Sequence, residues 1–562
     1  MSVTPSRIFD VVHLLMLFEG AIEEATAGYD ARFKACSLDM LHWSQGLFGF
    51  VANLGPLLEC LQPGLVNHAP QAPPVFNGDL SISELQIAYR QGLSPVSVAQ
   101  SVLGNIKKYL SIDPAVWIYR EPSESVLEQV KLLETRWPDR DTLPPLFGIP
   151  FSVKDNIDIA GLPTTTACPP LTRQHTKNAR IYDILISQGA IFVGKTNLDQ
   201  LATGLTGCRS PYGIPHSAIN HDYIAGGSSS GSCVSVGANL VSFSICTDTG
   251  GSGRVPAGFN GVVGFKPTKG TVSTQGVTPA CMSLDSIAII AKNIRDARTI
   301  WDLSVGLDEE DRYAKTCAPL QRHINATGPQ LNSFRFGIPP PQALSVCNPI
   351  YLRKFTPVVK LLQRLGGSLC PVDWTPFAKA GSLLYESSFV CERLANLPEN
   401  FLARYDWNFH PVITTIFSDV LARKYTAIDA HRDLQAQALY TRQVEKIFEY
   451  SASGIDVLVV PTAPTQYTVE EVLRDPVGTN TLLGEFSHFA NVLDLCGVAV
   501  PAGKYTVGEL RAEEGEVSQE SKKGDKETDG ELPFSVTLLG GRGLDAEVLG
   551  IAERLEAALK KG

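Results

Sequence analysis

Residues 226–232 read GGSSSGS, and residues 247–254 read TDTGGSGR. A short apolar segment, VSFSIC at 241–246, lies between the two runs. Glycine and serine bury little apolar surface, and each glycine costs backbone entropy when it is fixed. Two such runs close together therefore serve a purpose other than core packing, and serine chemistry is the first candidate.

Bulk composition excludes several classes of protein. The chain has 562 residues, of which 44% are hydrophobic, and this is enough to bury a large globular core. Its formal net charge is -10, so the totals give no electrostatic support for a nucleic-acid partner. No apolar stretch is long enough to span a bilayer. We therefore expect no nucleic-acid and no membrane partner, and a small-molecule substrate fits better.

Cysteine and histidine spacing argues against metal or disulfide frameworks. Twelve cysteines are scattered between Cys36 and Cys496, with no C-x-x-C pair. His221 and His410 belong to no metal or triad pattern, and they are predicted to be loop or core residues. The sequence thus predicts a cytoplasmic protein that needs no metal and no organic cofactor.

The order of apolar and polar segments predicts an α/β fold. Segments 150–155 and 190–196 read as buried strands, 455–465 reads as another, and helical segments alternate with them, so we expect a sheet with helices on both faces. Residues 81–92 and 544–561 are predicted to be helices, the first with Leu85, Ile87 and Ala88 on its apolar face.

Two regions stand apart from this domain. Residues 1–75 are predicted to form an N-terminal helical extension with a Pro-rich linker, in which 9–18 is a core helix rather than a signal peptide. The main domain then covers 76–562. Residues 509–531 are mostly charged and predict a solvated loop insertion within it.

Familiar catalytic designs do not fit the serine runs. Arg254 stands where the last glycine of G-x-S-x-G would be, which excludes the nucleophile elbow. H-E-x-x-H is absent, and GGSSSGS lacks the lysine of a phosphate-binding loop. Serine must then find a base other than histidine, and a lysine kept neutral by desolvation can be that base. Lys154, at the end of a predicted buried strand, is the candidate.

Three segments resemble the amidase signature family of serine hydrolases. They are 145–169 (PLFGIPFSVKDNIDIAGLPTTTACP), 226–232 and 247–270, and they occur in the order of the family's motifs. The resemblance implies the amidase signature fold, with a large mixed central sheet. It also implies a catalytic triad of Lys154, Ser228 and Ser252, with a cis peptide at Gly227 and Ser252 as nucleophile. The oxyanion hole would be the backbone N–H groups of Thr249, Gly250, Gly251 and Ser252.

Further fragments resemble the subgroup of this family that hydrolyses allophanate, among them 113–120, 194–205 and 276–289. The resemblance implies that Tyr385 and Arg393 bind substrate, and an eight-residue spacing on one helix would place them on the same face. An amphipathic helix with an incidental arginine is the alternative. The subgroup's second, smaller domain has no counterpart in this sequence, and Gly250 and Gly253 depart from the residues common among relatives.

These observations predict an amidohydrolase that releases ammonia from a small amide, with allophanate first, through an acyl-enzyme on Ser252. The alternatives are an amidase for another small amide and an amidotransferase-like subunit, and a homodimer is left open. Other residues near the motifs have structural interpretations: Ser230 as a helix cap, Asp248 with Arg254 as an ion pair, and Lys266 and Lys269 as structural or exposed side chains.

Overall fold

The structure is a computed structural model that describes residues 75–316, 333–398, 409–449, 454–513 and 530–561. The extension predicted for residues 1–75 lies outside these residues, apart from Val75 itself.

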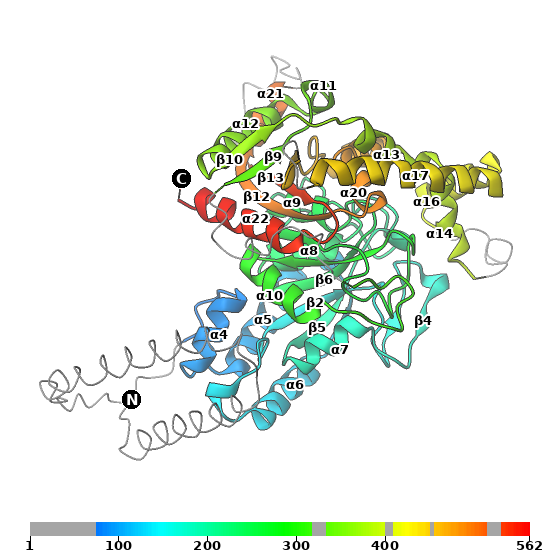
Figure 1. The fold of residues 1–562 in the computed structure, drawn as a ribbon. Helices are drawn as coiled ribbons and strands as arrows, with labels where there is room; N and C mark the ends of the chain where they lie inside the picture. The colour runs from blue at the N-terminus through cyan, green and yellow to red at the C-terminus, as the bar shows by residue number, and fades with distance from the viewer. Residues whose placement is uncertain (1–74, 317–332, 399–408, 450–453, 514–529, 562) are drawn as a thin grey trace, which may run out of the picture. The chain divides into compact units, whose positions relative to one another are not determined.

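An eleven-stranded mixed sheet forms the centre of the described protein, in the order β1-β5-β2-β6-β8-β7-β12-β13-β11-β9-β10 (Figure 1). Its strands are β1 (Trp117–Arg120), β2 (Pro150–Lys154), β5 (Ile191–Thr196), β6 (Phe243–Asp248), β7 (Val263–Lys266), β8 (Ser286–Ala291), β9 (Phe334–Gly337), β10 (Gly367–Cys370), β11 (Val457–Pro461), β12 (Cys496–Thr506) and β13 (Glu531–Gly540). A small separate sheet pairs β3 (Pro163–Thr164) with β4 (Arg173–Gln174). The strands predicted at 150–155, 190–196 and 455–465 are β2, β5 and β11.

Parallel pairing at the centre of the sheet decides where the functional loops emerge. β2 is parallel to both β5 and β6, and every residue of these three strands is buried. Strands that are covered on both faces are rich in apolar residues, which is why their segments stood out in the sequence. Since parallel strands end at the same edge of a sheet, the carboxyl ends of β2 and β6 lie together.

Helices surround the sheet. They are α4 (Ile82–Arg90), α5 (Pro95–Tyr109), α6 (Ser123–Arg136), α7 (Arg180–Ser187), α8 (Ser230–Gly237), α9 (Arg254–Phe259), α10 (Ile294–Ser304), α11 (Pro341–Leu344), α12 (Pro349–Arg364), α13 (Thr375–Glu386), α14 (Cys391–Ala395), α16 (Pro411–Arg423), α17 (Ala427–Phe448), α18 (Val469–Arg474), α19 (Gly478–Leu483), α20 (His488–Val492), α21 (Val507–Glu513) and α22 (Asp545–Leu559). α8 and α9 contact one another and the sheet, as α10 and α22 do, so helices cover both faces as predicted (Figure 1).

Two details differ from the sequence prediction. In α4 the buried face is Ile82, Leu85 and Tyr89, whereas Ile87 is 49% exposed, because Tyr89 rather than Ile87 packs on the core. The first residues of the charged loop predicted for 509–531 are helical, because α21 extends to Glu513. At the start of this helix the N–H of Glu509 donates to Thr506 Oγ1 at 3.1 Å. Residues 514–529 lie outside the described part of the chain.

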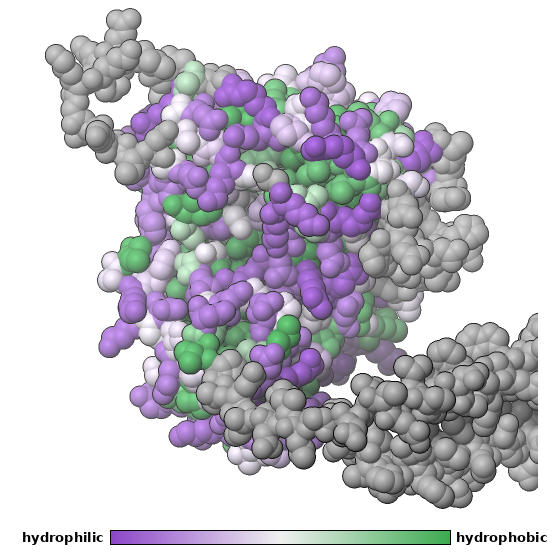
Figure 2. Space-filling model, turned by 90° about the vertical axis from the view of Figure 1, so that its left-hand side faces the viewer, coloured by the Kyte–Doolittle hydropathy of each residue, from purple (hydrophilic) through white to green (hydrophobic). Residues whose placement is uncertain are grey.

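One face of the described protein is mostly polar. Figure 2 shows hydrophilic side chains over most of one face, with apolar residues scattered among them. In the part of the chain that the structure describes, no helix combines the length and the apolar character needed to cross a membrane.

Candidate active site

Three predicted catalytic residues come from elements that meet at one edge of the sheet. Lys154 is the last residue of β2, Ser228 lies just before α8, and Ser252 lies in the loop that joins β6 to α9. The peptide bond between Gly227 and Ser228 is cis. The N–H of Ser229 donates to the carbonyl oxygen of Ser252 at 3.2 Å, so the two serine runs lie against one another. Ser252 is 4% exposed.

Lys154 is surrounded by hydroxyl groups. Its side chain is fully buried, and Nζ lies 2.8 Å from Ser228 Oγ, 2.9 Å from Ser229 Oγ and 3.1 Å from Thr247 Oγ1. Among the described residues, no carboxylate lies within ion-pair distance of this amine. Burial lowers the pKa of Lys154 to about 8. A substantial fraction of the amine is therefore neutral near physiological pH and able to accept a proton.

A second buried lysine differs from Lys154 in having a carboxylate partner. Lys195, on β5, is also buried, but its Nζ forms an ion pair with Asp155 Oδ1 at 2.7 Å and donates to Thr164 Oγ1 at 2.9 Å. The carboxylate compensates the charge of Lys195, and Lys154 has no such partner nearby. The two buried lysines therefore differ in their partners, which are a carboxylate for Lys195 and hydroxyl groups for Lys154.

Hydrogen-bond accounting leaves two hydroxyl groups that can donate to a neutral Lys154. A neutral amine has two N–H groups and one lone pair, so one of its three hydroxyl neighbours donates to the nitrogen. Ser229 Oγ already donates to the carbonyl of Thr247 at 3.1 Å. Among the described residues, neither Ser228 Oγ nor Thr247 Oγ1 donates to another acceptor, so the hydrogen of either hydroxyl is free for that nitrogen. Ser228 Oγ is the nearer of the two, at 2.8 Å.

The loop that carries Ser252 is held by a buried carboxylate. Asp248 accepts the backbone N–H groups of Gly251 at 2.8 Å and of Gly253 at 3.1 Å. Arg254 binds both of its oxygens, with Nε at 2.9 Å and Nη2 at 3.0 Å. Burial opposes ionisation of Asp248, but Arg254 outweighs it and lowers the pKa of the carboxyl to about 2. The structural ion pair predicted from the sequence is present, and it fixes the loop around Ser252.

One member of the predicted oxyanion hole is already engaged. Because the N–H of Gly251 donates to Asp248, it does not point freely at a substrate. Among the described residues, the N–H groups of Thr249, Gly250 and Ser252 have no acceptor, so three of the four predicted donors are free of other hydrogen bonds. Gly251 has φ of +122°, and a Cβ there would meet Ser487, so this position requires glycine.

Tyr385 and Arg393 meet, although not on one helix as predicted. Tyr385 lies in α13 and Arg393 in α14, because Ser387 adopts extended backbone and its hydroxyl donates to Leu383 O at 2.7 Å. Arg393 Nη2 nevertheless donates to Tyr385 Oη at 3.3 Å, and the guanidinium lies 5.3 Å from the tyrosine ring centre. The structure therefore brings the pair together by a turn instead of a continuous helix.

Arg393 is a buried cation without an acidic partner nearby. It is 4% exposed, and Nη1 donates to Thr203 Oγ1 at 2.7 Å. Its Nε finds no hydrogen-bond partner among the described residues, and no described carboxylate lies within 4 Å of the guanidinium. A buried guanidinium with spare donors is suited to bind an anion.

Two cavities adjoin these side chains. One, of about 460 Å³, is lined by Tyr385, His488 and Gly484, and the other, of about 190 Å³, is lined by Arg393, Ala280 and Thr166. Ser252 lines neither cavity. A Cβ on Gly250 would lie 2.5 Å from Leu384 Cδ2 and 3.3 Å from His488 Cδ2, so α13 and α20 pack directly on the loop that carries Ser252 and connect it to the larger cavity.

Several supporting residues were missed in the sequence. Thr249 Oγ1 donates to Asp285 at 2.5 Å, and Ser487 Oγ donates to the carbonyl of Gly250 at 2.8 Å. Asn491 Nδ2 donates to Asp248 O at 2.6 Å. The ring of His488 lies 5.2 Å from that of Tyr385, and burial lowers the pKa of this histidine to about 3. Asp285, Ser487, His488 and Asn491 are far from the serine runs in sequence, so no local pattern predicts them.

Minor predictions near the motifs had mixed outcomes. Ser230 is the first residue of α8 and not its cap, since Ser229 precedes the helix and uses its hydroxyl on Thr247 instead. Lys266 and Lys269 are structural and not exposed: both are buried, and each donates to a backbone carbonyl, of Pro267 and of Ser283.

A buried lysine without a carboxylate partner, close to two glycine–serine loops, is an arrangement in which a base can activate a serine for nucleophilic attack. The comparison with known families makes the class specific. The family model described as Amidase matches residues 100–549, and the chain belongs to this family.

The chain is also similar to individual proteins, in sequence and in structure. The chain is 35% identical over 445 residues to the urea amidolyase of Saccharomyces cerevisiae, which is 78% of this chain and 22% of that protein, so it spans about a fifth of that relative's length. It is 30% identical to one of the subunits of the glutamyl-tRNA(Gln) amidotransferase of Symbiobacterium thermophilum, over 75% of this chain and 90% of that relative. The solved allophanate hydrolase of Kluyveromyces lactis superposes with a TM-score of 0.72 at 33% identity and covers 85% of this chain and 72% of that one. The prediction of the amidase signature fold is confirmed.

Proposed function

We propose that this chain is an amidohydrolase that cleaves a small anionic amide, with allophanate as its substrate, and releases ammonia. The observation that carries the proposal is Arg393, a buried guanidinium beside Tyr385. Among the described residues, it has no carboxylate within 4 Å, and its Nε has no hydrogen-bond partner. Allophanate is a urea with a carboxylate at one end, and an arginine fork matches a carboxylate. The similarity to a urea amidolyase and to an allophanate hydrolase supports the same substrate.

The proposed mechanism uses the chain's own residues. Ser252 Oγ attacks the amide carbonyl, and its proton passes through Ser228 to Lys154. The developing oxyanion accepts from the N–H groups of Thr249, Gly250 and Ser252. Lys154 returns the proton through Ser228 to the leaving nitrogen, which departs as ammonia and leaves an acyl group on Ser252. Water then repeats the sequence and frees the serine.

The test is ammonia release by the purified chain from four amides: allophanate, biuret, malonamate and a simple aromatic amide. Release from allophanate well above the other three supports the proposal. Release from another amide alone keeps the amidase chemistry and contradicts the substrate. We place the reaction in the cytosol, and the nine cysteines among the described residues are free thiols.

The pH dependence tests Lys154 as the base. Because the neutral amine accepts the proton, kcat/KM is expected to rise with pH and level off above about 8, the pKa of Lys154. Below that value the rate falls about tenfold for each pH unit, as the protonated fraction grows. A pH–rate profile over the range in which the protein stays folded measures this limb. A midpoint near pH 6 would point to a histidine base and contradict the assignment.

Replacing Arg393 tests the anionic substrate. Arg393→Ala removes a charge-assisted hydrogen bond, so kcat/KM for allophanate is expected to fall about 100-fold. The rate with the neutral amide biuret should change much less, because biuret has no carboxylate. Arg432→Ala is the matched control, since Arg432 is 73% exposed. An equal loss with both substrates would show that Arg393 acts on the fold and not on the substrate.

A second candidate function follows from the similarity to one component of an amidotransferase. In that case the chain would release ammonia from an amide only as part of a complex, for a second protein to use. Activity of the purified chain alone on allophanate argues against this candidate. No ammonia release from any of the four amides, together with a protein that co-purifies with the chain, supports this candidate.

A further inference from the structure

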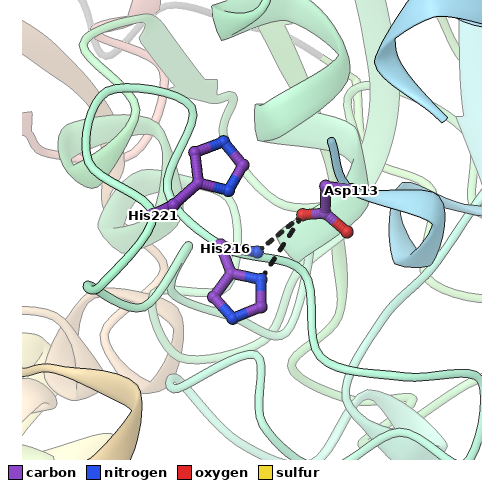
Figure 3. Close-up of side chains that lie close together, drawn as sticks. All are labelled: Asp113, His216 and His221. Atoms are coloured by element: carbon purple, nitrogen blue, oxygen red, sulfur yellow. Dashed lines mark hydrogen bonds and ion pairs between the residues drawn. The ribbon is translucent and has the colours of Figure 1, made fainter. Parts of the chain in front are cut away.

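Asp113, His216 and His221 form a cluster of metal-ligating side chains away from the serine–lysine site (Figure 3). One ligand atom from each side chain lies within 4.8 Å of the other two. Asp113 lies just before the short 3-10 helix Pro114–Val116 that leads into β1. The sequence predicted His221 as a loop or core residue, and it does lie in a loop. The cluster itself gives no sequence signal, because Asp113 is 103 residues from His216.

The carboxylate of this cluster is held in place. Asp113 is 2% exposed, Oδ1 accepts the N–H of Ala115 at 2.9 Å, and Oδ2 accepts the N–H of His216 at 2.8 Å. Each carboxylate oxygen keeps a further lone pair for a ligand. Asp113 is therefore a fixed anionic ligand, and the energetic cost of ordering it has already been met by the fold.

The two imidazoles face this carboxylate from one short loop. His216 pairs with Ile224 in an isolated bridge, and the N–H of Ser217 donates to the carbonyl of Tyr223 at 2.9 Å, so the loop folds back and brings His221 beside His216. Their ring centres are 5.8 Å apart, with an interplanar angle of 25°. Figure 3 shows the three side chains around a common gap.

Distances in the cluster suit a shared ion better than a direct contact. His216 Nδ1 lies 3.8 Å from Asp113 Oδ2, too far for a hydrogen bond. Two bonds of about 2.0 to 2.1 Å to one Zn²⁺ at a tetrahedral angle would place their ligand atoms about 3.3 Å apart. His216 is half-buried, and a small rotation of its ring would close this difference.

The geometry points to a binding site for a divalent transition-metal ion, best suited to Zn²⁺, held by Asp113, His216 and His221 with water in the fourth position. Two imidazoles and one carboxylate are ligands that Zn²⁺ accepts, whereas Ca²⁺ and Mg²⁺ prefer oxygen alone. A neighbouring group fits a bound water: the hydroxyl of Tyr109 is buried, finds no partner among the described residues, and belongs to a ring 6.3 Å from that of His221.

Such an ion would order the chain that enters the first serine run. Residues 216–224 run directly into GGSSSGS at 226, and the loop is already tied to the end of α9, where Ser217 Oγ donates to Phe259 O at 2.9 Å. The ion would tie the same loop to Asp113 at the start of β1. The ion takes no part in the proposed amide chemistry, so a result that contradicts this inference leaves the proposed function unaffected, and the reverse also holds.

The experiment is zinc binding by the full chain, prepared without a polyhistidine tag and stripped of metal with a chelator. Titration calorimetry is expected to show one Zn²⁺ per chain, and His216→Ala and His221→Ala are each expected to weaken it by about 100-fold or more. His175→Ala is the matched control, because His175 Nδ1 pairs with Asp158 at 3.2 Å without a third ligand among the described residues. This variant should bind zinc as the parent chain does.

A second measurement guards against a variant that misfolds. Co²⁺ bound in place of Zn²⁺ should give the visible absorption of a four-coordinate ion in the parent chain and in His175→Ala, and lose it in His221→Ala. Zinc should also raise the midpoint of thermal unfolding of the parent chain but not of His221→Ala. Absence of saturable zinc binding, or equal binding by the His221→Ala and His175→Ala variants, would overturn the site.

Discussion

Ser252→Ala is expected to lower kcat for amide hydrolysis by about 10⁶-fold, to the level of the assay background. The proposed mechanism gives the attack on the carbonyl to the Ser252 hydroxyl alone, and an alanine there leaves the lysine and its relay with no nucleophile to activate. The Ser252 side chain is small and its backbone carbonyl still accepts from Ser229, so the fold should be retained. Ammonia release under saturating substrate, with a thermal unfolding curve for the same preparation, measures both.

The neighbouring serines supply the controls. Ser230→Ala removes a buried hydroxyl that has no hydrogen-bond partner among the described residues, and it should keep activity within a few-fold of the parent chain. Ser228→Ala should be nearly as inactive as Ser252→Ala. When catalytic residues act as a unit, removing one of them costs about as much activity as removing all of them. Substantial ammonia release by a folded Ser252→Ala variant would place the nucleophile elsewhere and remove the basis of the acyl-enzyme.

Much of the fold and of the candidate site could be predicted from local sequence patterns. β2, β5 and β11 are rich in apolar residues, and their positions could be predicted because every residue of each strand is buried. The placement of Lys154 at the end of β2 follows from the same pattern. Glycine positions near the serine runs are also local signals: a Cβ on Gly227 would collide with the carboxylate of Asp199, so the backbone passes where only glycine fits.

Partners that are distant in sequence could not be predicted. The patterns of Lys154 and Lys195 are alike, and only the fold shows that Asp155 neutralises one of them. The helix expected to carry Tyr385 and Arg393 breaks at Ser387, because a serine hydroxyl competes for backbone groups and ends the helix. Local patterns therefore predicted which residues are candidates, and long-range packing decides what each of them contacts.

Arg254→Met is expected to destabilise the protein by about 3 to 5 kcal/mol, because it leaves the carboxylate of Asp248 buried without its cation. Arg254 also donates to Ser487 O at 3.2 Å and to Asn491 Oδ1 at 3.1 Å, so the same change loosens the α20 segment that packs on the loop that carries Ser252. Urea unfolding at pH 7 measures the loss. Lower activity of the folded fraction is expected as well, since Asp248 orients the loop around Ser252.

The sign of the pH dependence separates an uncompensated charge from lost packing. In the parent chain the pKa of Asp248 is about 2, so the stability that comes from this ionised carboxyl is present above its unfolded pKa and disappears as the pH falls toward 2. Without Arg254, burial raises the pKa of Asp248, and acid relieves the penalty by protonating it. The destabilisation by Arg254→Met should therefore be smaller at pH 5 than at pH 7.

A double variant gives a second test of the same charge. Asp248→Asn combined with Arg254→Met should lower the free energy of unfolding by less than the sum of the two single changes. A loss that is independent of pH and additive in the double variant would show that Arg254 stabilises the loop through packing, and that the charge of Asp248 has little to do with it.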